Sequence, residues 1–65
     1  MHLDTKRMRV LRAEKALSQE NVAHSAKISQ NHYSAIERGQ RIPRLEVLDG
    51  IAKTLGCGVK ELLVE

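Results

Sequence analysis

Residues 17–39 read LSQENVAHSAKISQNHYSAIERG, and this stretch decides the fold. Ser18 and Ser29 each stand directly before a short segment with apolar residues at helical spacing. A serine hydroxyl at that position caps the N-terminus of a helix well. The pattern therefore predicts two helices, over about 19–26 and 30–38, with only three residues between them. Two short helices this close together form a compact pair at a steep angle.

Apolar residues recur at helical spacing on both sides of these two predicted helices as well. This spacing predicts helices over about 4–15 and 44–55 and a last short helix after Gly58, which makes five in all. Gly39 and Gly56 mark where two of these helices end, because glycine is favoured just past a helix. No segment alternates between apolar and polar residues over four positions, so we expect no strands. The predicted fold class is all-α, with five packed helices.

The composition limits what such a chain can be. Sixty-five residues make one domain, residues 1–65, and such a domain buries only about 60% of the surface that its unfolded chain exposes. Cys57 is the single cysteine, which excludes a disulfide framework and a Cys-rich zinc site and favours a reducing cytoplasm. The longest apolar run, three residues, is too short to span a membrane. We expect no metal, no cofactor and no enzymatic activity from a chain too small to enclose a substrate pocket.

Positive charge is concentrated in the first two thirds of the chain. Residues 1–44 hold nine Lys and Arg against four Asp and Glu, whereas residues 45–65 hold two against four. A phosphate polymer would be attracted to the first part and repelled by the second. A solvated helix face would give the same counts, so the charge leaves both interpretations open. Tyr33 is the only aromatic residue, which excludes a stacking platform for single-stranded nucleic acid.

The outer face of the helix predicted over 30–38 differs from an ordinary solvated face. It carries short or amide-tipped side chains, namely Gln30, Asn31, Ser34 and Ala35. A helix exposed only to water would carry Glu and Lys instead. Amides reach base edges in the major groove of DNA and form paired hydrogen bonds with adenine, and an alanine methyl packs on the thymine methyl. A face that is merely polar is the alternative interpretation.

A longer set of residues, from Met8 to Leu63, extends this pattern. It comprises Arg9-x-Leu11-Arg12-x-x-Lys15, Leu17-Ser18-Gln19-Glu20-x-Val22-Ala23, Ile28-Ser29, Ser34-x-Ile36-Glu37-Arg38-Gly39, x-Arg41-x-Pro43, Leu45-x-x-Leu48, Ile51-Ala52-Lys53-x-Leu55-Gly56 and Glu61-Leu62-Leu63. With these residues the chain resembles the lambda-repressor-like helix-turn-helix family, also called the XRE family. The resemblance implies a compact five-helix DNA-binding domain, with the motif over about 18–38 and a recognition helix over about 29–38. It also implies a role as a sequence-specific transcriptional regulator.

The resemblance further implies roles for single residues. Bases in the major groove would be read by Gln30, Asn31, Ser34 and Ala35. Phosphates would be bound by Gln19, Ser29, His32, Arg38 and Arg41. Arg12 and Glu37 match a structural ion pair that ties the first helix to the end of the third, and we expect this pair to be partly buried and bidentate.

The sequence departs from the family pattern at four positions. Lys27 stands where glycine is frequent, and a left-handed backbone there costs about 1–2 kcal/mol. Arg44 replaces a Ser or Thr cap, so the start of the fourth helix frays or is capped in another way. Ala35 replaces a longer polar residue and leaves the target sequence open. Gly50, inside the fourth helix, is either drift or a place where another chain approaches closely.

The sequence therefore predicts a dimeric repressor. It would bind a palindromic operator in double-stranded DNA, with half-sites about one helical turn apart. The expected surface between two copies comprises Val47, Gly50, Val59, Leu63 and Val64. The alternative hypothesis is a protein-interaction module on the same fold, an antitoxin or an adaptor, with a protein partner. We expect no membrane contact and a cytoplasmic location.

Overall fold

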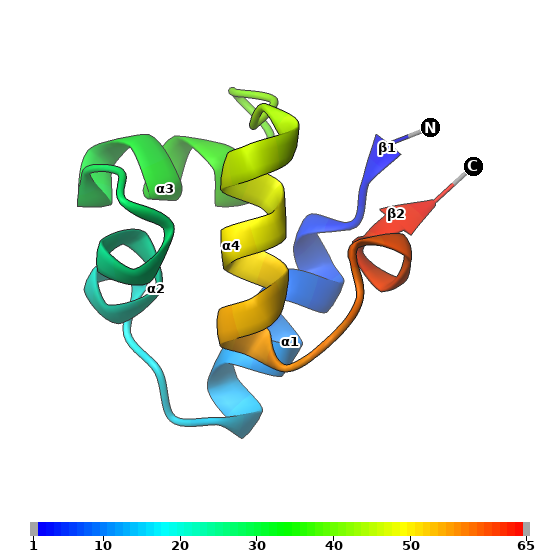
Figure 1. Ribbon diagram of the computed structural model, residues 1–65, viewed down its shortest axis with the longest axis horizontal. Helices are drawn as coiled ribbons and strands as arrows, with labels where there is room; N and C mark the ends of the chain where they lie inside the picture. Colours follow the sequence, from blue (N-terminus) through cyan, green and yellow to red (C-terminus); the bar gives the residue numbers. More distant parts are fainter. Residues whose placement is uncertain (1, 65) are drawn as a thin grey trace.

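The computed structural model describes residues 2–64, and Figure 1 shows how their elements are arranged. The elements are β1 (His2–Leu3), α1 (Thr5–Glu14), α2 (Gln19–Ala26), α3 (Gln30–Glu37), α4 (Leu45–Leu55), the 3₁₀ helix η1 (Val59–Leu62) and β2 (Leu63–Val64). α4 stands in the middle, with α2 and α3 on one side and the two strands on the other. Within residues 2–64 no helix has the length and apolar character that crossing a membrane requires.

The two helices predicted around the central stretch are present as α2 and α3, and a serine begins each of them. Ser18 Oγ accepts a hydrogen bond from the Asn21 backbone N–H at 3.0 Å, and Asn21 Oδ1 accepts one from the Ser18 N–H, also at 3.0 Å. Asparagine thus completes a capping box that usually uses Glu or Gln. Ser29 Oγ accepts from the His32 N–H at 3.0 Å. Each cap stabilises the start of its helix by about 1 kcal/mol.

The turn between α2 and α3 depends on one left-handed residue, Lys27, with φ 63° and ψ 40°. Its N–H donates to the His24 carbonyl at 3.1 Å, and the Ile28 N–H donates to the Ala23 carbonyl at 3.0 Å. These bonds close the end of α2. Because Lys27 has a Cβ, this conformation is strained, as its place in the pattern suggested. Ala16, between α1 and α2, has φ 55° and is strained in the same way. Nothing in the sequence indicated a left-handed residue at this position.

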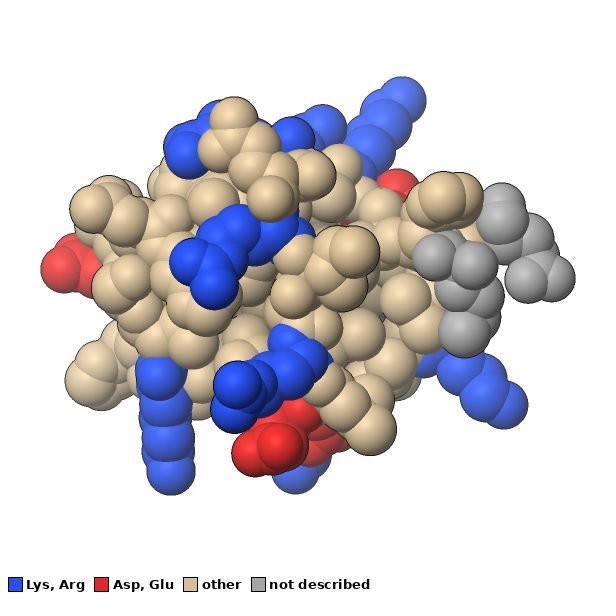
Figure 2. Space-filling model, turned by 90° about the horizontal axis from the view of Figure 1, so that it is seen from above, with Lys and Arg blue, Asp and Glu red and all other residues tan. Residues whose placement is uncertain are grey.

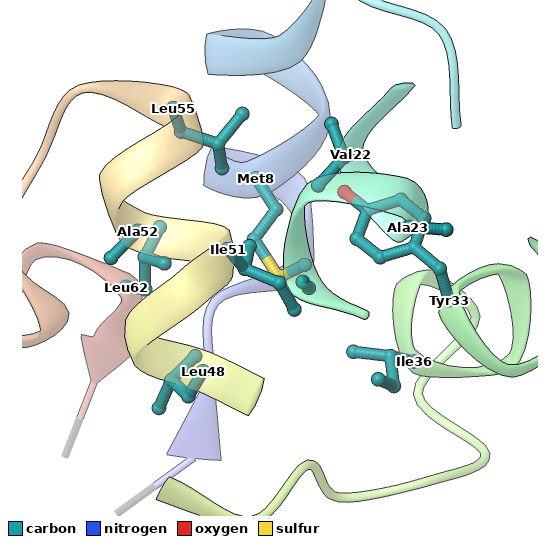
Figure 3. Packing of buried hydrophobic residues seen from close by; sticks show 11 residues of the cluster. Met8, Val22, Ala23, Tyr33, Ile36, Leu48, Ile51, Ala52, Leu55 and Leu62 are labelled. Atoms are coloured by element: carbon teal, nitrogen blue, oxygen red, sulfur yellow. The ribbon is translucent and has the colours of Figure 1, made fainter. Parts of the chain in front are cut away.

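The core forms around α4, where side chains from every helix meet (Figure 3). The largest fully buried side chains, all less than 2% exposed, are Met8, Val22, Tyr33, Ile36, Ile51, Leu55 and Leu62. Two of them, Tyr33 and Ile36, come from α3 and point inward, since their spacing of three places them on one side of the helix. Because one side of α3 is fixed in the core, its opposite side faces solvent.

Two departures from the family pattern lie in α4. A Cβ at Gly50 would come within 3.3 Å of the Ala26 Cα, so the missing side chain lets the end of α2 approach α4 closely. This contact within the chain accounts for the glycine, and contact with a second copy stays a prediction. Arg44 is the N-cap of α4, and within the described part of the chain its side chain makes no capping hydrogen bond.

The ends of the described chain differ from the sequence prediction. β1 and β2 form a two-stranded antiparallel sheet, with His2 opposite Val64 and Leu3 opposite Leu63, so the expectation of no strands was wrong. Strands of two residues are too short to show any alternation. The last short helix is present as 3₁₀ helix, which gives four α-helices and one 3₁₀ helix over residues 2–64. The all-α helix-turn-helix fold is otherwise confirmed.

Replacing Lys27 by glycine is expected to raise the free energy of unfolding by about 0.5–1 kcal/mol. Relief of the left-handed strain exceeds the entropy that an added glycine gives the unfolded chain. The control is Ala13→Gly on the exposed side of α1, which should lower the same quantity by about 1 kcal/mol. Urea unfolding measures both, and a loss of stability in both variants would show that the turn is not strained.

Candidate nucleic-acid interface

α3 presents its short polar side chains away from the core. Gln30 and Asn31 are exposed, and Ser34 and Ala35 are half-buried. The inner side of the same helix is anchored by Tyr33, which is fully buried. All four side chains expected to read bases therefore lie on one helix and outside the core.

Glu37, the last residue of α3, carries a buried charge that joins three helices. Its side chain is 3% exposed. From α1, Arg12 Nε donates to Glu37 Oε2 at 2.8 Å and Arg12 Nη2 donates to Oε1 at 3.2 Å. From α2, Gln19 Nε2 donates to Oε1 at 2.9 Å. The ion pair has the partly buried, bidentate geometry expected of it, and Gln19 adds a third donor that the sequence did not suggest.

Two more hydrogen bonds from α1 end on backbone carbonyls. Arg9 Nη1 donates to the Glu37 carbonyl at 2.8 Å, and Arg12 Nη1 donates to the Leu17 carbonyl at 3.1 Å. The Glu37 carbonyl lies at the C-terminal end of α3, where carbonyls lack helical partners and attract cations. Sequence analysis gave Arg9 no role. The available signal was its spacing of three from Arg12, which places both on one face of α1.

The protonation state of Glu37 follows from these contacts. Burial by itself raises the pKa of Glu37, but the hydrogen bonds it accepts, above all those from Arg12, outweigh burial and hold the pKa below its usual value. The neighbouring Tyr33 hydroxyl is buried, and among the described residues it has no hydrogen-bond partner of good geometry. Burial raises the pKa of Tyr33 above its usual value. At neutral pH the carboxylate is therefore charged and the tyrosine is neutral.

The residues expected to bind phosphates surround α3. Gln19 is the first residue of α2, and its side-chain amide has two N–H groups. One donates to the Glu37 carboxylate, and the other remains to bind a phosphate. Ser29 uses its hydroxyl to cap α3. His32 is half-buried, whereas Arg38 and Arg41 are exposed.

Arg38 is held against the end of α3 by two side chains. Its Nη1 donates to Ser34 Oγ at 2.6 Å, and its Nε and Nη2 donate to Gln40 Oε1 at 3.2 and 3.1 Å. We call these three residues, Ser34, Arg38 and Gln40, the Arg38 clamp. A guanidinium has five N–H groups, so the clamp leaves two for a phosphate.

Basic side chains also line a groove beside α3. It lies between the α2–α3 turn, the loop after α3, and α4, and its basic lining residues are Lys27, His32, Arg41, Arg44 and Lys53. Its acidic lining residues, Glu46 and Asp49, both belong to α4. Figure 2 views the end of the molecule that carries α3 and the loop, and most of the charge on this face is positive.

The sequence from 8 to 62 matches the family model described as helix-turn-helix. The chain belongs to this family. The resemblance to lambda-repressor-like proteins that the sequence indicated is thereby confirmed.

Two curated relatives of this helix-turn-helix protein are bacterial regulators. The cryptic phage CTXphi transcriptional repressor RstR of Vibrio cholerae is 39% identical over 57 residues, which cover 88% of this chain and 51% of RstR. The HTH-type transcriptional regulator DdrOP3 of Deinococcus deserti is 42% identical over 57 residues, which cover 88% of this chain and 44% of DdrOP3. The chain thus spans about half the length of these relatives.

Among solved structures, the helix-turn-helix domain is similar to SinR of Bacillus subtilis. The structure of SinR in complex with DNA superposes with a TM-score of 0.84 at 27% identity. The match covers 95% of this chain and 100% of that one.

Most of the residues expected to form the surface between two copies of this helix-turn-helix protein pack against the protein's own core instead. Three of its residues are half-buried and pack against the core: Val47, Val59 and Leu63. Val64 is 44% exposed. Over residues 2–64 the most exposed apolar side chains are Ile42 at 93% and Leu45 at 72%, and neither belongs to the surface expected between two copies. The dimer surface therefore stays a prediction.

Replacing Arg12 by Met is expected to lower the free energy of unfolding by about 3 kcal/mol, because it strands the Glu37 carboxylate in the core. The matched control is Lys53→Met, which breaks the exposed pair of Lys53 Nζ and Asp49 Oδ2, 3.3 Å apart. That change should cost less than about 0.5 kcal/mol. Urea unfolding at pH 7 measures both. Equally small losses would mean that the buried pair does not hold the helices together.

The stability of the protein is expected to fall as the pH falls below the ordinary pKa of a glutamate side chain. Since the pKa of Glu37 is lowered by folding, its contribution is present above the ordinary glutamate pKa and is lost as the pH drops through the folded-state value. Glu37→Gln should be less stable than the wild type at pH 7 and should depend less on pH in this range. Urea unfolding at several pH values tests this, and parallel curves for the two proteins would contradict it.

Proposed function

We propose that this protein is a sequence-specific transcriptional regulator that reads the major groove of double-stranded DNA with α3. The observation that carries the proposal is the outward face of α3, where Gln30 and Asn31 are exposed on a helix anchored by Tyr33 and Glu37. Amide side chains in this position suit the donor and acceptor pattern of base edges. In helix-turn-helix proteins the second helix of the motif, here α3, lies in the major groove. The first helix of the motif, here α2, crosses the DNA backbone.

Phosphate contacts would position the protein on the duplex. Gln19 lies at the N-terminus of α2, where backbone N–H groups and the helix dipole favour an anion. Arg38 and Arg41 are exposed on the α3 side, and a groove with several basic side chains lies next to them. Contacts of this kind fix the register of α3 but carry no sequence information.

The relatives support a repressor in particular. RstR is described as a transcriptional repressor, and SinR is seen in complex with DNA. We therefore propose repression by a dimer that binds a palindromic operator. The two-fold symmetry of such a dimer matches the two-fold symmetry of the two DNA half-sites. A protein that acts on operators works where the DNA is, so a cytoplasmic location belongs to the same proposal.

Replacing Gln30 by Ala is expected to lower the preference for a selected palindrome over random DNA by about tenfold. A paired amide contact contributes about 1–3 kcal/mol of discrimination, and 1.4 kcal/mol corresponds to a factor of ten. The measurement is the Kd of wild type and variant for a duplex selected in vitro and for a random duplex, in rising salt. The logarithm of the association constant should fall linearly with the logarithm of salt concentration.

Lys60→Ala is the control for that experiment, because Lys60 lies on η1, which packs on α4, α1 and β2 rather than on α3. It should leave the preference unchanged. Equal losses of Gln30→Ala on both duplexes would refute base reading by Gln30. Absence of any sequence preference in the wild type would refute the proposed function, and a protein partner co-purified in its place would favour the antitoxin or adaptor hypothesis.

A further inference from the structure

We propose that the Arg38 clamp biases Ser34 toward donating its hydroxyl proton to DNA, so that Ser34 disfavours cytosine at the base it contacts. Ser34 then determines specificity, and Arg38 and Gln40 are positioning residues that act through it. The proposal deepens the proposed function and rests on it.

The placement of Ser34 on α3 comes first. Gln30, Ser34 and Arg38 are spaced by four residues, so they follow one stripe along the helix. Gln30, at the start of this stripe, is exposed, and Arg38, at its end, is exposed as well. Ser34 therefore lies between an amide that would read bases and a cation that could reach a phosphate.

The clamp fixes the direction of the Ser34 hydroxyl. Arg38 Nη1 donates to Ser34 Oγ at 2.6 Å, and the positive charge of the guanidinium strengthens this hydrogen bond. A guanidinium has no acceptor, so Ser34 can only accept from it, and the hydroxyl proton is repelled by the positive charge. The single O–H of Ser34 therefore turns away from Arg38 and remains to be donated elsewhere.

Gln40 holds the guanidinium in this orientation. Its Oε1 accepts from both Nε and Nη2 of Arg38, at 3.2 and 3.1 Å. The Gln40 N–H in turn donates to the Ala35 carbonyl at 2.9 Å, which fastens the clamp to the end of α3. The chain reaches this position through Gly39, whose φ of 77° lets it reverse directly after the helix.

A donor at Ser34 distinguishes one base from the other three. In the major groove guanine offers N7 and O6, adenine offers N7 and thymine offers O4, and all of these atoms are acceptors. Cytosine offers only the N4 amino group, which is a donor. A serine without the clamp could rotate its hydroxyl to accept from cytosine, whereas a serine that already accepts from Arg38 is biased against it.

The test compares base preferences at each position of a duplex selected by the wild type. We expect one position where cytosine weakens binding by about three- to tenfold, the size of one hydrogen bond. Ser34→Ala and Arg38→Met should each abolish this penalty, and Ser34→Thr, which keeps the hydroxyl, should retain it. Gln40→Ala should reduce it.

Arg41→Met is the matched control, since Arg41 is an exposed arginine outside the clamp. It should weaken binding to all sequences alike and leave the cytosine penalty intact. The proposal is overturned if Arg38→Met also lowers affinity uniformly with the penalty unchanged, because Arg38 then acts on phosphate alone. It is equally overturned if Ser34→Ala changes no base preference. If the wild type shows no sequence preference at all, the proposed function is refuted, and the inference about Ser34 is refuted with it.

Discussion

A carboxylate buried at the end of α3 fixes how this helix is oriented against α1 and α2. A buried charge is stable only when it is paired and hydrogen-bonded, so Glu37 must keep its partners. Those partners, Arg12 and Gln19, come from α1 and α2. Because hydrogen bonds tolerate little change in distance or angle, α3 has little freedom to rotate or slide against the other two helices. The outward placement of Gln30 and Asn31 follows from this constraint as much as from the apolar core.

Local signals predicted most of the fold, and long-range contacts account for what they missed. The caps at Ser18 and Ser29 and the inward placement of Tyr33 depend on residues within one helical turn, so sequence spacing reveals them. The pairing of β1 with β2 joins opposite ends of the chain and rests on two residues from each. Arg9 is similar, because its partner is a backbone carbonyl 28 residues away, which no residue type encodes.

The sequence indicated the kinds of side chain on the outer face of α3 and one ion pair behind it, but not the hydrogen bonds of the Arg38 clamp. Short polar side chains on one face of α3 are visible in the sequence, and so is the Arg12–Glu37 pair through the resemblance. The Arg38 clamp depends on the backbone reversal at Gly39, which brings Gln40 back toward α3, and a reversal of that kind is not encoded in helix spacing. Lys27 and Arg44 show a further pattern. Both stand where the backbone would favour Gly or Ser, and both line the basic groove.

The pairing of β1 with β2 has a practical consequence for coupling the protein to a label or a solid support. His2 and Val64 are neighbours across the sheet, on the side of the molecule away from α2 and α3 (Figure 1). A short peptide that joined His2 to Val64 would therefore close the domain into a ring, and a circular permutant could open the backbone at an exposed loop instead. A bead, dye or surface coupled at His2 or Val64 would leave the opposite side of the molecule unobstructed.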